Sequence, residues 1–146
     1  MRLNKYLLCF IIIASSFTCP LFAITKNPPE VLIAYFSPNG TTKELAQQIS
    51  AGAKKIPDTK VVLKNVANIK LKDIEDAKAL IIGCPVYYAN IPRQFLGFFN
   101  NWTIRNTRLK YKIAAVFDTG GGATAGRESV LFSLMRPLFL YQDIIV

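Results

Sequence analysis

Histidine is absent from this chain of 146 residues, and cysteine is scarce, with only three in all. Cys9 and Cys19 lie near the N-terminus, so that Cys84 is the one cysteine in the rest of the chain. Zinc sites in proteins are built largely from histidine and cysteine, and nucleophilic triads use histidine as the base. A zinc centre, a Cys–His pair and a Ser–His–Asp triad are therefore excluded.

Acidic residues are also few. Asp and Glu number 9 against 18 Lys and Arg, which gives a formal net charge of +9 at pH 7. The lysines are scattered along predicted helix ends and loops, which is the ordinary pattern of a solvated surface. The alternative is a surface that favours an anionic membrane, as a peripheral protein, or acidic partners. Nucleic-acid binding is not expected, because the chain has no basic–aromatic motif.

The N-terminus has the layout of a secretory signal peptide. The short positive stretch "MRLNK" precedes an apolar run at residues 6–17, and a small residue follows at Ala23. This pattern predicts a signal peptide at 1–23 and export to the periplasm or the exterior. The run is short for a membrane span, and an uncleaved N-terminal anchor is the alternative. A linker is predicted at 24–30 and one globular domain at 31–146.

Apolar runs and amphipathic segments alternate along this domain. Runs rich in β-branched and aromatic residues predict strands at 31–37, 58–66, 78–86, 111–119 and the beginning of one at 143–146. Helical spacing predicts helices at 41–56, 92–102 and 127–140, with a short helix or irregular crossover at 67–77. Strands that alternate with helices predict an α/β fold with a doubly wound parallel sheet and helices on both faces.

Three details of the predicted helices can be checked directly. Leu45 begins an apolar stripe that should face the sheet, and Thr41 with Glu44 has the spacing of a capping box. Pro92 is suited to the first position of its helix, and Pro137 should bend or end the last one. The remaining residues of the stripe are Ile49, Ala53 and Ile56.

Three loops of unusual composition follow strands of the predicted sheet: "SPNGTT", "PVYYANIP" and "DTGGGATAG". Strands of a doubly wound sheet bring such loops together at their carboxyl ends, where ligands bind. The first loop offers hydroxyls and backbone N–H groups to a phosphate at a helix N-terminus, although a capped helix needs much of the same. The second offers Tyr87 and Tyr88 to a flat ring, although a tyrosine can simply cover the sheet edge. The third lets a ligand approach the backbone closely, although it would also serve as a flexible connection.

The segment 31–146 resembles the flavodoxin-like superfamily, and most closely its WrbA-type quinone oxidoreductases. The stretches that carry the resemblance are "YFSPNGTTKELA", "IIGCPVYYANIPRQFLGFF" and "VFDTGGGATAGRES", in this order and at similar spacing. The resemblance implies an FMN whose phosphate is bound by Ser37, Asn39, Gly40, Thr41 and Thr42. It implies that the isoalloxazine ring lies by Pro85, Val86, Tyr87, Tyr88, Ala89 and Asn90, and by Thr119, Gly120, Gly121 and Gly122.

The resemblance also implies what the protein does. NAD(P)H would deliver hydride to the flavin, which would reduce a quinone by two electrons without any catalytic side chain. Relatives of this type commonly form homo-oligomers. The alternatives are a flavodoxin-type electron carrier that passes electrons to a redox partner, or a degenerate fold that no longer holds flavin. The family's final helix, after the fifth strand, is expected to be lacking here.

Overall fold

The computed structural model describes residues 27–102, 109–122 and 125–146. The predicted signal peptide, with Cys9 and Cys19, lies outside these residues, as do residues 24–26 of the predicted linker. The signal peptide and the export that follows from it therefore stay predictions. Two residues of the glycine-rich loop, 123 and 124, also lie outside the described part. None of the helices in the described residues has the length and apolar character needed to cross a membrane.

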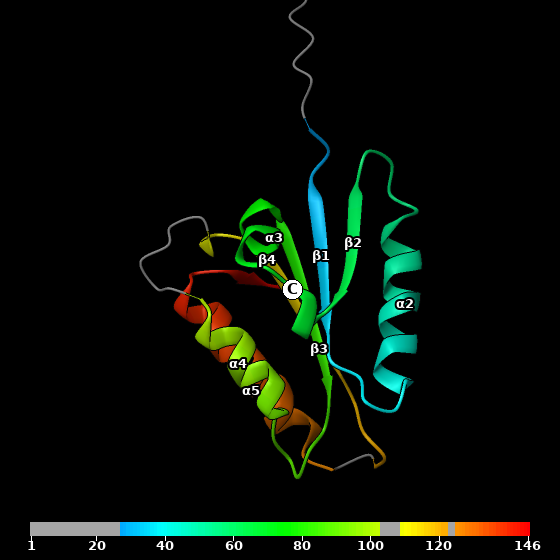
Figure 1. Cartoon of the computed structure of the whole chain (residues 1–146), viewed down its shortest axis with the longest axis vertical. Helices are drawn as coiled ribbons and strands as arrows, with labels where there is room; N and C mark the ends of the chain where they lie inside the picture. The colour runs from blue at the N-terminus through cyan, green and yellow to red at the C-terminus, as the bar shows by residue number, and fades with distance from the viewer. Residues whose placement is uncertain (1–26, 103–108, 123–124) are drawn as a thin grey trace, which may run out of the picture.

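The described residues form one parallel sheet with strand order β2-β1-β3-β4-β5. Helix α2 covers one face of the sheet, whereas α4 and α5 lie side by side on the other (Figure 1). This arrangement confirms the predicted α/β class and the doubly wound sheet. In chain order the elements are β1 (Glu30–Tyr35), α2 (Thr41–Ala53), β2 (Lys60–Asn65), η1 (Val66–Asn68), α3 (Leu71–Asp76), β3 (Ala79–Pro85), α4 (Arg93–Asn100), β4 (Ile113–Thr119), α5 (Arg127–Leu140) and β5 (Ile144–Ile145).

The central strands are buried on both faces, which explains their unbroken apolar sequence. Leu32 and Ile33 are neighbours in β1, their side chains point to opposite faces, and neither is exposed at all. The face under α4 and α5 holds the larger core, built from bulky side chains. Its members include Leu80, Ile82, Phe95, Trp102, Leu134, Leu138 and Tyr141.

The other face is packed differently, and here the predicted stripe of α2 is wrong. Thr42, Ala46 and Ser50 are the buried residues of α2. Leu45 is 37% exposed, because at about 100° per residue it lies roughly 100° around the helix from the buried Ala46. Ile56 is 61% exposed and lies beyond the end of α2. Small side chains facing the sheet allow α2 to lie close to it. Ile49 and Ala53, at the edge of the contact, are half-buried.

The predicted helix starts also need correction. Gly40 caps α2 with φ 94°, and no side chain caps the helix, so the predicted capping box of Thr41 and Glu44 does not form. Pro92 precedes α4 as its cap instead of forming its first residue, because its ψ of 145° is extended. Pro137 does not end α5, which continues to Leu140 because both Leu134 and Leu138 are buried in the core.

Candidate functional site

The three predicted loops meet at the carboxyl ends of β1, β3 and β4, where they surround a cavity of about 430 Å³. The cavity lies beside the switch point where the strand order changes direction between β1 and β3, as expected for a ligand site in this class of sheet. Ten of the fifteen predicted site residues line it. They are Ser37, Asn39, Thr41, Thr42, Pro85, Val86, Tyr87, Thr119, Gly120 and Gly121.

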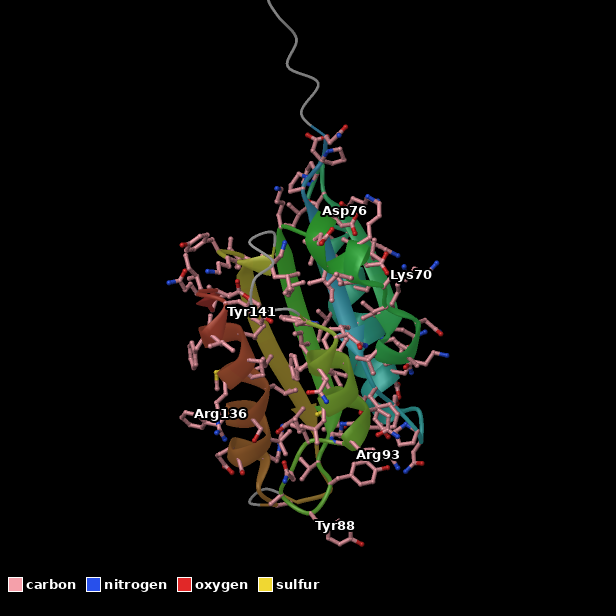
Figure 2. The ribbon with its side chains drawn as sticks, turned by 60° about the vertical axis from the view of Figure 1, so that its left-hand side comes forward. Lys70, Asp76, Tyr88, Arg93, Arg136 and Tyr141 are labelled. Carbon is pink, nitrogen blue, oxygen red and sulfur yellow. The ribbon has the colours of Figure 1, made fainter. Side chains whose placement is uncertain are left out.

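The structure places the other five predicted residues outside this lining. Tyr88 is fully exposed at the tip of its loop and points away from the protein (Figure 2). Asn90 lines a separate cavity between α4 and α5. Gly40, Ala89 and Gly122 do not line the cavity either, although Gly40 and Ala89 shape its loops. Pro38 lines the cavity and was not among the predicted residues, although it belongs to the same six-residue loop.

The first loop presents an uncapped helix end to the cavity. Gly40 has the positive φ that lets the chain turn sharply into α2, and its N–H donates to Oγ of Ser37 at 3.1 Å. No side chain accepts a hydrogen bond from the first turn of α2. The first N–H groups of a helix have no intrahelical acceptor, and the helix dipole favours negative charge there. This end of the cavity is therefore suited to an anion.

A hydrogen bond between the hydroxyls of the buried Thr42 and the half-buried Thr119 joins the first and third loops. Oγ1 of Thr42 and Oγ1 of Thr119 lie 2.7 Å apart, although the two residues are 77 positions apart in the chain. Thr42 is 1% exposed, so this bond lies at the base of the cavity. It holds the N-terminal turn of α2 against the end of β4, and both residues line the cavity.

The second loop is a tight hairpin turn held at both ends. Tyr87 and Asn90 exchange two backbone hydrogen bonds, of 3.0 and 2.8 Å, around Tyr88 and Ala89. Both central residues have positive φ, 48° and 59°, as a type I′ turn requires, and such conformations are strained for side chains other than glycine. Gly126 packs so closely on Ala89 that a Cβ at Gly126 would overlap it. The turn is thus fixed against the start of α5.

The lining itself carries no carboxylate and no cation, and its one titratable side chain is that of Tyr87. Charge lies directly behind the wall, where Asp118 of β4 pairs with Arg127 of α5 at 2.8 Å. Sequence reasoning missed both residues, because a pair between a strand end and a helix start gives no local signal. Burial, and then the negative charge of Asp118, raise the pKa of the Cys84 thiol to about 12. Cys84 is therefore a neutral core residue at physiological pH.

Comparison with known proteins agrees with this geometry. The family model described as "Flavodoxin domain" matches residues 32–139. The chain belongs to the flavodoxin family. Among its relatives, a flavodoxin of Clostridium saccharobutylicum is 26% identical over 111 residues, which cover 76% of this chain and 68% of that protein. An NAD(P)H dehydrogenase (quinone) of Archaeoglobus fulgidus is 27% identical over 144 residues, covering 80% of this chain and 74% of that protein.

Solved structures show the same fold as this flavodoxin-family chain. A WrbA-like flavodoxin from Agrobacterium tumefaciens superposes with a TM-score of 0.70 at 18% identity and covers 80% of this chain and 75% of its own. A Fusobacterium nucleatum flavodoxin bound to flavin mononucleotide gives a TM-score of 0.67 at 18% identity. The match covers 80% of this chain and 68% of the Fusobacterium chain. At this identity the likeness concerns the fold. The predicted membership of the flavodoxin-like superfamily, with relatives among quinone oxidoreductases, is confirmed.

Proposed function

We propose that this chain binds FMN in the three-loop cavity and uses it to transfer electrons from NAD(P)H to a quinone. The observation that carries the proposal is the convergence of three loops, far apart in the sequence, on one cavity that has the uncapped N-terminus of α2 at one end and Tyr87 and Gly121 at the other. The Fusobacterium nucleatum flavodoxin, whose structure contains flavin mononucleotide, supports FMN as the cofactor.

The first loop has the groups that a phosphate requires. The uncapped N-terminal turn of α2 offers backbone N–H donors, and Ser37 and Thr41 add hydroxyls at its mouth. The hydroxyl of Thr42 is already bonded to Thr119, so its first role is to hold the loop in place. We therefore assign the phosphate to the backbone of residues 39–42 and to the hydroxyls of Ser37 and Thr41.

The second and third loops have the groups that a flat ring requires. Tyr87 supplies an aromatic surface on one side, and Gly121, where nothing would lie within 4 Å of an added Cβ, lets a ring approach the backbone on the other. Val86 donates its N–H to the carbonyl of Thr119 at 2.9 Å, which keeps the two loops together. The ring would lie between them, close to the phosphate end.

When bound, FMN supplies the electron chemistry. The residues of this chain orient it, exclude water from one side and offer neutral hydrogen-bond donors. No described residue of the lining is a carboxylate or a cation that could exchange a proton with a substrate, and hydride transfer to a flavin does not require one.

A second candidate function is that of an electron carrier, which is supported by the relatives named flavodoxin. The net charge, which is +9 for the chain and 9 − 2 = +7 without Arg2 and Lys5 of the predicted signal peptide, favours the enzyme, because a carrier that docks on a basic redox partner needs an acidic surface.

Steady-state kinetics separate the two functions. The full chain, loaded with FMN, is mixed with NADH or NADPH and a benzoquinone. We expect oxidation of the nicotinamide that saturates with quinone, and a Thr41→Val variant that loses FMN should lose the same activity. Thr59→Val, in a loop far from the cavity, is the matched control. If the loaded chain accepts electrons from dithionite but never from NAD(P)H, it is a carrier and not a quinone reductase.

A further inference from the structure

An ion pair between a buried carboxylate and a partly exposed guanidinium lies directly behind the wall of the cavity. The Asp118 side chain is 1% exposed and turned toward α5, whereas Thr119, the next residue of β4, lines the cavity. Nε and Nη2 of Arg127 each lie 2.8 Å from Oδ1 of Asp118. The second carboxylate oxygen, Oδ2, is buried and has no hydrogen-bond partner among the residues that the structure describes. Arg127 is therefore the counter-charge of a carboxylate held in the protein interior.

Arg127 also touches the loop that forms the cavity wall. A Cβ built on Gly120 would lie 3.3 Å from Cγ of Arg127 and 3.3 Å from Cγ2 of Val86, so Gly120 is enclosed between these two side chains. Gly120 and Val86 both line the cavity. The Arg127 side chain is 43% exposed, and its guanidinium keeps donors beyond the two that Asp118 uses. A positive group is thus held immediately behind the half of the cavity that we assign to the ring.

We propose that Asp118 and Arg127 are positioning residues that set the reduction potential of the bound flavin. This inference rests on the proposed function. The stem of Arg127 keeps Gly120 against Val86, and its charge favours negative charge in the cavity. The carboxylate of Asp118 anchors Arg127 and opposes that effect. A hydride from NAD(P)H carries two electrons and one proton, leaves NAD(P)⁺ behind and adds one negative charge to the flavin. The positive charge of Arg127 favours this added charge and the negative charge of Asp118 disfavours it, so the two together change how favourable the transfer is.

The test is the midpoint potential of FMN bound to the full chain, to three variants of the ion pair and to one control variant. Arg127→Gln leaves Asp118 uncompensated and should lower the potential, whereas Asp118→Asn leaves Arg127 unopposed and should raise it. We expect each change to alter the ratio of affinities for reduced and oxidised flavin about tenfold, which for a two-electron couple is about 30 mV. The double variant removes both charges and should return close to the wild type. Arg136→Gln, the same charge change on the exposed side of α5, is the matched control and should leave the potential unchanged.

If the two single variants shift the midpoint potential in opposite directions, the pair acts on the potential through its charges. A purely structural role would weaken FMN binding in both variants and would not move their potentials apart. Shifts in the same direction, or none, overturn the inference. If Arg127→Gln does not fold, Arg127→Lys keeps the charge and should keep the potential, and the rise predicted for Asp118→Asn still tests the inference. Folded wild-type chain that binds no FMN overturns the proposed function as well. Wild-type binding and turnover with unchanged variant potentials overturn this inference alone.

Discussion

The two faces of the sheet are packed on different principles. Under α4, a cluster of aromatic rings fills the core, with Phe95, Phe98, Phe99, Trp102 and Tyr141 in edge or tilted contacts whose centroids lie 5.3 to 6.0 Å apart. On the face covered by α2, small residues meet the sheet instead. There Ile113 and Ile144, which pair across β4 and β5, remain 52% and 64% exposed.

The difference shows how stability and binding are distributed in this domain. The aromatic face supplies most of the large buried side chains. The α2 face carries the helix N-terminus and the Thr42–Thr119 hydrogen bond, so its close packing positions the cavity. We expect substitutions on the aromatic face to act on folding first. On the α2 face they should act on both folding and binding.

The largest expected effect is on the aromatic face. Phe95 is completely buried and contacts two other rings, so Phe95→Ala should lower the free energy of unfolding by about 3–5 kcal/mol. Ile113→Ala, half-exposed on the other face, should cost less than about 1 kcal/mol. Urea unfolding followed by circular dichroism measures both. Equal losses from the two variants would contradict the division between the faces.

A smaller effect is expected where β3 and β4 meet on the α2 face. A Cβ at Gly83 would overlap the ring of Phe117, so Gly83→Ala should cost about 1–3 kcal/mol. Gly52 lies in α2, and nothing would lie within 4 Å of an added Cβ, so Gly52→Ala should stabilise the protein by up to about 1 kcal/mol. Thermal unfolding of Gly83→Ala and Gly52→Ala shows whether the first variant is less stable, and the second more stable, than the wild type. A Gly83→Ala variant as stable as the wild type would show that Phe117 does not lie across β3.

The smallest effect concerns the polar start of α3. Asp73 accepts hydrogen bonds from Nζ of Lys64 at 2.8 Å and from the N–H of Lys70 at 2.9 Å, and both contacts hold the pKa of its carboxyl below the usual 3.8. A lowered folded-state pKa stabilises the protein above 3.8, and this contribution disappears as the pH falls below that value. Asp73→Asn removes the charge from these hydrogen bonds and should therefore cost about 1 kcal/mol at neutral pH.

Urea unfolding between pH 7 and pH 3 checks this dependence, with Asp76→Asn as the control. Asp76 pairs with Lys72 on the surface, where its side chain is 51% exposed, so its loss should change little at any pH. A difference between Asp73→Asn and the wild type that stays constant down to pH 3 would contradict the assigned hydrogen bonds.

Much of the fold could be predicted from the sequence because the central strands are buried on both faces. The apolar runs of β1, β3 and β4 have no polar alternation, and together with the helical segments between them they favour a covered parallel sheet. The three loops were also predicted correctly as neighbours, since parallel strands bring their carboxyl ends to one edge.

The parts that failed depend on tertiary contacts. The apolar stripe beginning at Leu45 was taken as the buried side of α2, but packing brought the smaller Ala46 to the sheet. Tyr88 was predicted to lie by the ring; the strained turn directs its side chain away from the protein and outside the cavity lining, so its contact with a flavin stays a prediction. Asp118 and Arg127 become partners only when β4 and α5 are assembled. A single sequence holds no local pattern for any of these.

The proposed function depends on the binding of FMN in the cavity formed by the three loops. The most direct measurement is a titration of FMN with the full chain, followed by flavin fluorescence and absorbance, with circular dichroism to establish that the chain is folded. We predict saturable quenching at about one FMN per chain, weakened in Thr42→Val, which breaks the bond between the first and third loops. Folded chain that leaves the flavin spectrum unchanged at every concentration would contradict the claim.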